Sequence, residues 1–438
     1  MSPELIGGLF FVVAIGLLCT GLHIGLVLSL AGVIGAWVIQ GNFGMVIGLL
    51  KSTPYASVAV YDLSVVPLFI LMGEFTLYGG ISGAAYSAIN HWVGRIRGGL
   101  AVATVWACAA FGATSGSSVA AASVFTKVSY PEMKKAGYDK YFAAGLIASA
   151  STLAMLIPPS LYMVIFGILA QQSVAQLLIA GLLPGIMTAV LLSIVIYIYA
   201  VRNPKLAPAY KINYSWREKN IATLQAWPML LLAAIIIGGI YSGIFTPTEA
   251  SAIGAFVALI ISVVMRRLTW SQFKASLMDT AVTAAMLSFV IIGATVFAKL
   301  MTISSLPLWM GDLINNSGFS GIWIIIIILV IYGVLGCFID ALSIMFILTP
   351  IFAPILMKLG VNMIWFGVLN TVILNLGTIT PPFGLCVFTV KAIAGPDVSV
   401  EGVFKGSFFT YWAQIGSLAL LIAFPWISTV LPNLMAGK

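Results

Sequence analysis

Long apolar stretches separated by short polar turns run along the whole chain. Many of them reach about 18 residues, the length at which a helix can cross the hydrocarbon core of a bilayer. The pattern predicts an all-α polytopic membrane protein. We expect membrane segments at residues 5–20, 22–40, 63–80, 98–126, 140–173, 174–200, 222–243, 248–265, 280–301, 320–350, 363–394 and 406–430.

Two of these stretches carry a pair of prolines deep inside the apolar run. The sequence reads "LIPPS" at 156–160 and "TITPP" at 378–382. Each proline removes a backbone donor and clashes with the preceding turn, so a pair should end a helix. We therefore predict that the segments 140–173 and 363–394 are broken helices.

Composition and charge narrow the class further. The chain has 438 residues, of which 61% are hydrophobic and only 7% are charged. A soluble domain carries roughly 25% charged residues, so a soluble fold is excluded. The net charge of +8 is explained by basic cytoplasmic loops rather than by nucleic-acid binding. The basic loops 201–220 and 266–274 are assigned to the cytoplasm and the turn 243–251 to the outside, which places the N-terminus outside.

The two halves share their turn signals when one is displaced by 223 residues. We interpret them as two copies of one unit, 1–220 and 221–438. With the orientation above, the segment 98–126 enters the membrane from inside and 320–350 from outside, both as re-entrant hairpins, so the copies are inverted. Inverted repeats with matching broken helices are typical of secondary transporters, because exposed backbone is tolerated where it lines a cavity or holds a ligand. The coinciding residues are Pro131 with Pro354, Gly137 with Gly360, Pro158 with Pro381, and Pro159 with Pro382.

The two hairpin segments carry polar groups. The stretch 111–123, "FGATSGSSVAAAS", concentrates hydroxyls among small residues. Such a stretch suits a hairpin tip that meets a hard cation, and small residues also suit close helix packing. The matching stretch 336–345, "GCFIDALSIM", places Asp340 opposite Ser117. A carboxylate within a membrane segment is functional by default, so we expect Asp340 to bind Na⁺, orient a ligand or carry a proton.

Five motifs, specific only in combination, extend over most of the chain: "PLFILMGE" at 67–74, "GSSVA" at 116–120, "AGLIASASTLAMLIPPS" at 144–160, "GIFTPTEASAIGA" at 243–255 and "LGTITPPFGL" at 376–385. With them the chain resembles the large membrane subunit of a TRAP (tripartite ATP-independent periplasmic) transporter. The resemblance implies an inverted-repeat, elevator-type fold akin to the divalent anion/Na⁺ symporters. In such a fold, a mobile domain with both hairpins and both broken helices slides against a scaffold.

The resemblance also implies Na⁺-driven uptake of an organic acid, C4-dicarboxylate-like or a sugar acid, in the bacterial inner membrane. A periplasmic substrate-binding protein delivers the acid, and a small four-helix membrane subunit is the partner; no such segment precedes residue 1, so we expect the large subunit to stand alone. The implied Na⁺ ligands are Ser115, Ser117, Ser118, Gly336, Asp340, Gly377, Thr378 and Thr380. The implied substrate-binding residues are Pro158, Pro159, Ser160, Thr378, Pro381 and Pro382.

Three other readings stay open at this point. A proton-coupled organic anion carrier would use Asp340, with Glu74, as its relay. A channel is less favoured, because selectivity filters usually lie on an oligomer axis and this chain has its own internal two-fold. An intramembrane enzyme would need a base beside Ser117, and neither histidine lies near mid-span, so we expect no enzyme activity. "GLLKST" at 48–53 lacks the spacing of a phosphate-binding loop, so an ion gradient or a partner must supply the energy.

Overall fold

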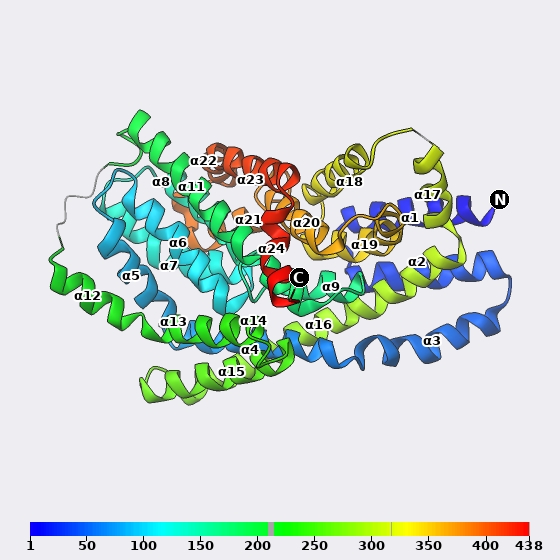
Figure 1. The fold of residues 1–438 in the computed structure, drawn as a ribbon, viewed down its shortest axis with the longest axis horizontal. Coiled ribbons are helices and arrows are strands. Elements are labelled where there is room, and N and C mark those ends of the chain that lie inside the picture. The colour runs from blue at the N-terminus through cyan, green and yellow to red at the C-terminus, as the bar shows by residue number, and fades with distance from the viewer. Residues whose placement is uncertain (209–213, 317, 438) are drawn as a thin grey trace.

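Helices are the only regular elements in the residues that the computed structural model describes, which are 1–208, 214–316 and 318–437 (Figure 1). The first half contains α1 (Pro3–Cys19), α2 (Ile24–Gln40), α3 (Phe43–Val58), η1 (Tyr61–Ser64), α4 (Val65–Tyr78), α5 (Ile81–Val93), α6 (Gly99–Ser115), α7 (Ser118–Lys135), α8 (Lys140–Ser151), η2 (Thr152–Met155), α9 (Leu161–Leu169), α10 (Val174–Ala180) and α11 (Leu182–Arg202). The second half contains α12 (Trp216–Gln225), α13 (Trp227–Ala233), η3 (Ala234–Gly238), α14 (Gly239–Tyr241), α15 (Pro247–Val264), α16 (Trp270–Ile303), α17 (Leu306–Asn316), α18 (Gly321–Gly336), α19 (Ala341–Lys358), α20 (Met363–Gly377), α21 (Leu385–Ala394), η4 (Gly395–Asp397), α22 (Val400–Ser407), η5 (Phe408–Thr410), α23 (Tyr411–Ala423) and α24 (Trp426–Met435). The expected all-α class is confirmed.

The same local signals start equivalent helices in the two halves. Asp139 accepts hydrogen bonds from two backbone N–H groups at the start of α8, and Asn362 does the same for α20. Two residues earlier, Gly137 and Gly360 have φ values of 82° and 71°, a left-handed conformation that glycine adopts at no steric cost. The two caps are separated by the same 223 residues that align the two halves of the sequence. Each half therefore encodes the turn before its broken helix in the same way.

Tertiary contacts pair the two halves reciprocally. Helix α2 packs on α16, and their sequence equivalents α15 and α4 pack on each other. Likewise, α7 packs on α21 while α19 packs on α9, and α8 packs on α22 while α20 packs on α10. In Figure 1 the hairpin α6–α7 lies on the left and the hairpin α18–α19 on the right, with α20, α21 and α24 between them. This reciprocity is what an internal two-fold produces; the orientation of that axis relative to a membrane stays a prediction.

One pair of equivalent regions differs in length and continuity. Helix α16 is continuous over 34 residues and begins ten residues before the segment expected at 280–301. Its counterpart in the first half is divided into α3 and α4, and α3 was not predicted at all. The sequence "KSTP" at 51–54 interrupts the apolar pattern of α3. The helix therefore lacks an apolar stretch long enough to be predicted as a membrane segment. Lys299 of α16 donates a hydrogen bond to the Thr53 hydroxyl of α3 at 2.9 Å, which ties the two regions together.

Few helices are long enough to cross a membrane alone. Six in the described ranges have the length and composition of a span, or seven if the pair α12 and α13–α14, bent by 51°, counts as one. The twelve expected segments include hairpin arms and half-helices. The hairpin arms α6 and α18 and the half-helix α20 are shorter than a full membrane span. The segment expected at 406–430 is wrong as a single helix, because the chain breaks at Phe424 and Pro425 between α23 and α24.

Backbone-to-backbone packing joins the halves beside the first broken helix. A Cβ on Gly406 of α22 would lie 1.9 Å from the Tyr141 carbonyl oxygen of α8, and one on Gly145 would lie 2.2 Å from the Gly406 carbonyl carbon. Helices can approach this closely only where glycine removes the side chain. The first broken helix is therefore clamped against an element of the second half.

Candidate functional site

The first predicted helix break is present and fully enclosed. Helix α8 ends at Ser151, one 3₁₀ turn follows, and α9 begins at Leu161. The Ser160 hydroxyl donates to the Met155 carbonyl and accepts a hydrogen bond from the first turn of α9 at 3.2 Å, so it spans the break and caps the new helix. The Pro158–Pro159 peptide bond is cis. All ten residues of 151–160 are buried.

The second break is present at the matching place but is open. Helix α20 ends at Gly377, α21 begins at Leu385, and the Pro381–Pro382 bond is cis. The hydroxyls of Thr378 and Thr380 donate to carbonyls of α20 at 2.8 and 2.6 Å. A hydroxyl that donates in this way keeps its lone pairs available to a cation. Both prolines and the following Phe383 are exposed.

The first hairpin turns at Gly116 and lies directly on the first break. Gly116 has a φ of 61°, and a Cβ there would be 2.3 Å from the Pro159 carbonyl oxygen. Ser117 then caps α7 by accepting the Ala120 N–H at 3.3 Å. Three of the predicted Na⁺ ligands, Ser115, Ser117 and Ser118, flank Gly116 and therefore lie in one tight turn. Ser115 is buried.

The second hairpin meets the second break through glycine as well. A Cβ on Gly377 would lie 2.8 Å from the Gly336 carbonyl oxygen, and the Phe383 N–H donates to the Cys337 carbonyl at 3.0 Å. Asp340 caps α19: one carboxylate oxygen accepts the Ser343 N–H at 3.0 Å and the other accepts the Ser343 hydroxyl. Asp340 therefore occupies the same structural position as Ser117, as the alignment of the halves predicts.

Polar groups from the two halves meet around Cys386 and Tyr162. The buried Cys386 thiol, at the start of α21, faces the hydroxyls of Ser118, Ser151 and Thr378. Tyr162, in the first turn of α9, interacts with Ser118 and with the charge of Asp340. The Ser118 hydroxyl is buried and makes no hydrogen bond of normal geometry within the described part of the chain, so it is available to a ligand. The structure thus brings Ser118, Thr378 and Asp340 into one neighbourhood.

Several polar residues of this region were missed by sequence reasoning. The sequence pattern did not single out Cys386 or Tyr162. Asn370 and Asn375 on α20 are fully buried, and among the described residues neither amide group makes a hydrogen bond of normal geometry, although Asn370 interacts with Tyr332. A buried unpaired amide is costly, which marks both as candidates for ligand contact. Their position inside an apolar run, close to the break, was the only available signal.

The start of α23 forms hydrogen bonds with residues of both breaks. The Tyr411 hydroxyl donates to the Ile379 carbonyl of the second break at 2.6 Å. One turn later, the Gln414 amide donates to the Thr152 hydroxyl of the first break at 3.0 Å. The start of α23 therefore contacts both breaks.

A cavity opens beside the second hairpin tip, on the side of the second break. It has a volume of about 390 Å³, and its walls come from α1, from the hairpin tip and from the break. Its lining residues are Cys19, Phe338, Pro382, Phe383, Leu385 and Phe388. Of the predicted substrate-binding residues, Pro382 lines this cavity, whereas Pro158, Pro159 and Ser160 are enclosed.

The two residues considered for proton transfer have different electrostatic neighbours. Glu74 of α4 interacts with Asp279 of α16, which accepts a hydrogen bond from Tyr78 at 3.4 Å. Asp340 instead lies near Tyr162. In the described ranges no group of three or more His, Cys, Asp or Glu side chains could hold a metal ion, so the available ligands are hydroxyl, carbonyl and single carboxylate oxygens.

Residues 11–427 match the family described as the DctM component of the tripartite ATP-independent periplasmic transporters. This chain belongs to that family. A C4-dicarboxylate TRAP large permease protein of Pseudomonas aeruginosa is 36% identical over 85% of this chain and 86% of its own length. An ectoine/5-hydroxyectoine TRAP large permease of Ruegeria pomeroyi is 36% identical, with 87% and 89% covered. A sialic acid TRAP large permease of Vibrio cholerae is 30% identical, with 97% of each chain covered.

A solved structure extends the likeness of this TRAP large permease to its fold. The YdaH transporter of Alcanivorax borkumensis superposes with a TM-score of 0.59 over 86% of this chain and 88% of that one, at 16% identity. At that identity the match concerns the fold alone. The predicted recognition and the predicted fold class of this TRAP permease are confirmed, while its ion and substrate ligands stay predictions.

Proposed function

We propose that this TRAP large permease catalyses Na⁺-coupled uptake of an organic acid across the bacterial inner membrane. A periplasmic substrate-binding protein delivers the acid, and a small four-helix membrane subunit completes the complex. One observation carries the proposal: groups from the first hairpin tip and from the second break converge on Cys386. We call this group of residues, Ser118, Ser151, Thr378 and Cys386, the cradle. Because it is made of both repeats, its exposure changes when the repeats move, and coupling of ion binding to substrate transport requires such a change.

The available oxygen atoms suit Na⁺. Hard cations prefer carboxylate, carbonyl and hydroxyl oxygens. We assign one Na⁺ to the first hairpin tip, with Ser115, Ser117 and Ser118 and nearby backbone of the second half. The second Na⁺ belongs between the second hairpin and the second break. Its ligands are Gly336, Asp340, Gly377, Thr378 and Thr380.

The substrate belongs between the hairpin tips and the two breaks. The half-helices α9 and α21 both begin there, and a helix N-terminus attracts a carboxylate through its free N–H groups and its dipole. Ser160, Thr378 and the backbone of the two proline pairs surround that position. C4-dicarboxylate, ectoine and sialic acid permeases all occur among the relatives, so anionic and zwitterionic solutes fit the same framework.

Transport then proceeds by sliding of one domain past another. The moving part comprises both hairpins and both broken helices, and the remaining helices form the scaffold. In this structure the second break lines an open cavity while the first is enclosed. Movement of the hairpins and breaks as a unit would change which side of the membrane the cradle faces.

The test is uptake by the complete three-part complex in proteoliposomes, with the substrate identified by a thermal-shift screen of the cognate binding protein. Replacing Na⁺ by choline at fixed pH should lower the initial rate at least tenfold. Undiminished uptake in choline, driven instead by a proton gradient, would overturn Na⁺ coupling. That result would favour the proton-coupled alternative that uses Asp340, whose charge acts on Tyr162.

A further inference from the structure

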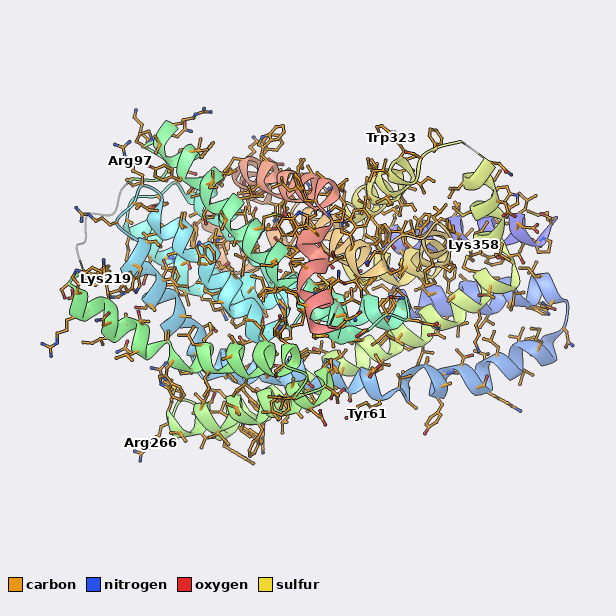
Figure 2. The ribbon with its side chains drawn as sticks, in the orientation of Figure 1. Tyr61, Arg97, Lys219, Arg266, Trp323 and Lys358 are labelled. Carbon is orange, nitrogen blue, oxygen red and sulfur yellow. The ribbon has the colours of Figure 1, made fainter. Side chains whose placement is uncertain are left out.

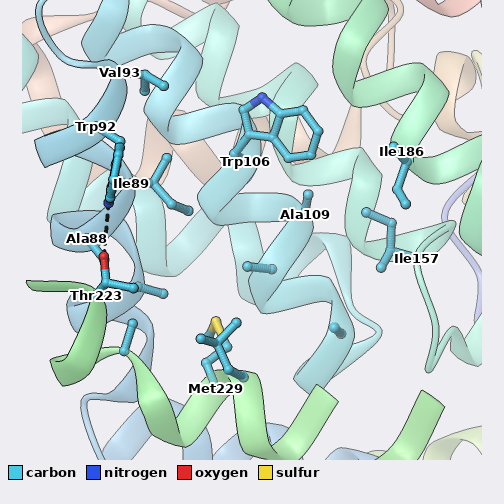
Figure 3. A pocket seen from close by; sticks show the side chains of 15 residues that line it. Ala88, Ile89, Trp92, Val93, Trp106, Ala109, Ile157, Ile186, Thr223 and Met229 are labelled. Atoms are coloured by element: carbon cyan, nitrogen blue, oxygen red, sulfur yellow. Dashed lines mark hydrogen bonds between the residues drawn. The ribbon is translucent and has the colours of Figure 1, made fainter. Parts of the chain in front are cut away.

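An apolar cavity lies between two groups of helices (Figure 3). It has a volume of about 520 Å³, within the roughly 300–1,000 Å³ of ligand-binding sites. Helices α5, α12 and α13 form one wall, and α6 and α11 form the other. Exposed side chains of Trp92, Ile186 and Leu230 stand at its rim, so it is open to the surroundings of the protein.

The walls of this cavity offer contacts for hydrocarbon. Thr223 is the one residue of the lining with a hydroxyl group, and that hydroxyl already accepts a hydrogen bond from the Trp92 indole at 2.9 Å (Figure 3). The remaining lining is alanine, aliphatic side chains, Met229 and the rings of Trp92 and Trp106. An occupant therefore needs an apolar body that fills the space between α5 and α6.

A cation stands beside this apolar space. Lys219 lies one helical turn before Thr223, and its ammonium is 5.4 Å from the ring centre of Trp92 and 5.3 Å from that of Trp216. The neighbouring Glu218 uses its carboxylate to cap its own helix, accepting the Ser215 N–H at 2.6 Å. In the described part of the chain Lys134 and Asp397 form the sole ion pair, so Lys219 has no carboxylate partner there.

Two more cations follow α5 in the chain. Arg95 and Arg97 come two and four residues after Val93, the last lining residue of α5, and both are exposed. Figure 2 places Arg97 and Lys219 toward the same end of the molecule. Tryptophan beside a cluster of Lys and Arg is the arrangement found at the level of lipid headgroups.

We propose that this cavity binds one anionic phospholipid. An acyl chain fills the apolar space between α5, α6 and α13, and Lys219, Arg95 and Arg97 hold the phosphate. The cation–π contacts keep the Lys219 ammonium at the rim, where it meets the headgroup. The lipid comes from the cytoplasmic leaflet, because these basic residues belong to that side by the positive-inside rule.

The lipid would also affect transport, and this part rests on the proposed function. Its chain contacts Ile157, which directly precedes the first proline pair, and α6, which is an arm of the first hairpin. The opposite wall belongs to the scaffold. A bound chain therefore fills the gap between moving and fixed parts. We expect the lipid to change the maximal uptake rate without changing the Na⁺ requirement.

Lipid binding is measured first without transport. The delipidated full chain is incubated with phosphatidylglycerol or phosphatidylethanolamine and examined by native mass spectrometry. We expect at least fivefold higher occupancy by phosphatidylglycerol. The double variant Lys219→Gln/Arg95→Gln should lose that preference, and Ala110→Phe, or Ala88→Phe from the opposite wall, should lower occupancy at least fivefold.

Lys274→Gln is the matched control, since the Lys274 ammonium lies 5.6 Å from the Trp270 ring centre but not beside this cavity. Equal binding of both lipids, or an equal loss in the control, would overturn the proposal. So would unchanged occupancy in both folded phenylalanine variants. Loss of small-subunit binding in Ala88→Phe, with lipid occupancy unchanged, would assign the cavity to a protein helix instead. Because lipid binding is read in the absence of substrate, failure of Na⁺ coupling would leave this result interpretable.

Discussion

The two breaks carry the same proline pair but present it in opposite ways. The first is covered by its hairpin, whose tip residue Gly116 touches the Pro159 carbonyl. The position equivalent to Gly116 in the second hairpin is Ile339, whose side chain is buried. A branched side chain cannot permit the same backbone approach, so the second hairpin makes its close contact earlier, at Gly336. The tip residue is therefore one difference between the hairpin over the closed break and the hairpin beside the open one.

The comparison also separates the chemistry of the tips. The first hairpin offers neutral hydroxyls, and the second offers the carboxylate of Asp340 at the position of Ser117. Each tip reaches the half-helix that starts after the break of the other repeat, through Cys386 and Tyr162. The repeats are therefore alike in backbone and different in charge. Ion binding is expected to be stronger at the charged tip.

The largest expected effect comes from adding a side chain to Gly116, the glycine at the tip of the first hairpin. Gly116→Ala should lower uptake at least tenfold, because a left-handed alanine costs about 1–2 kcal/mol and its Cβ would overlap the Pro159 oxygen. Gly48→Ala on α3 is the control, since a Cβ there would meet no atom within 4 Å and its φ is ordinary. Its uptake should fall less than threefold. Equal effects of the two variants would contradict the requirement for a glycine at the first hairpin tip.

The next effect concerns the charge at the second tip. Asp340→Asn should lower uptake about tenfold or more and raise the Na⁺ concentration for half-maximal rate. Asparagine still accepts the Ser343 N–H, so the cap and the melting temperature should persist. Ser117→Ala at the first tip should have a smaller effect. Uptake by Asp340→Asn with normal Na⁺ dependence would exclude the carboxylate as an ion ligand.

Thiol labelling sharpens the difference in exposure. Ser160 and Phe383 occupy equivalent positions after the two proline pairs, and they are 0% and 44% exposed. In a cysteine-free background, Phe383→Cys should react with a maleimide at least ten times faster than Ser160→Cys. Rates are read by mass spectrometry of the full chain, with a fully unfolded sample as reference. Equal rates in folded protein would mean that the breaks do not differ in access.

The smallest expected effect lies at the ion pair between Lys134 and Asp397, whose equivalents in the other repeat are Met357 and Val174. Lys134 lowers the pKa of Asp397 through a hydrogen bond and its charge. The pair therefore stabilises the fold at neutral pH and is lost as the pH falls through that lowered pKa. Because both side chains are exposed, Lys134→Met should lower the melting temperature by no more than about 2 °C.

This difference should vanish in acid, where Asp397 is protonated in both proteins. Lys135→Met is the control, because Lys135 forms no ion pair among the described residues. A larger change in the control than in Lys134→Met would remove the pair as a contributor. Differential scanning fluorimetry at neutral and acidic pH provides the measurement.

The sequence by itself determined the helical class and the two breaks, and it predicted the repeat, because these follow from apolar length, from proline and from matched turn residues. It also placed Asp340 opposite Ser117. It missed α3, whose polar "KSTP" stretch lies within a helix stabilised by α16, and it joined α23 to α24 across Pro425.

Only the tertiary structure decided which side chains meet. Ser118 and Thr378 are 260 residues apart and converge on Cys386 because α7 packs on α21. The exposure of one break and the burial of the other were equally invisible in the sequence, since the proline pairs are identical. Both depend on packing between segments that are distant along the chain.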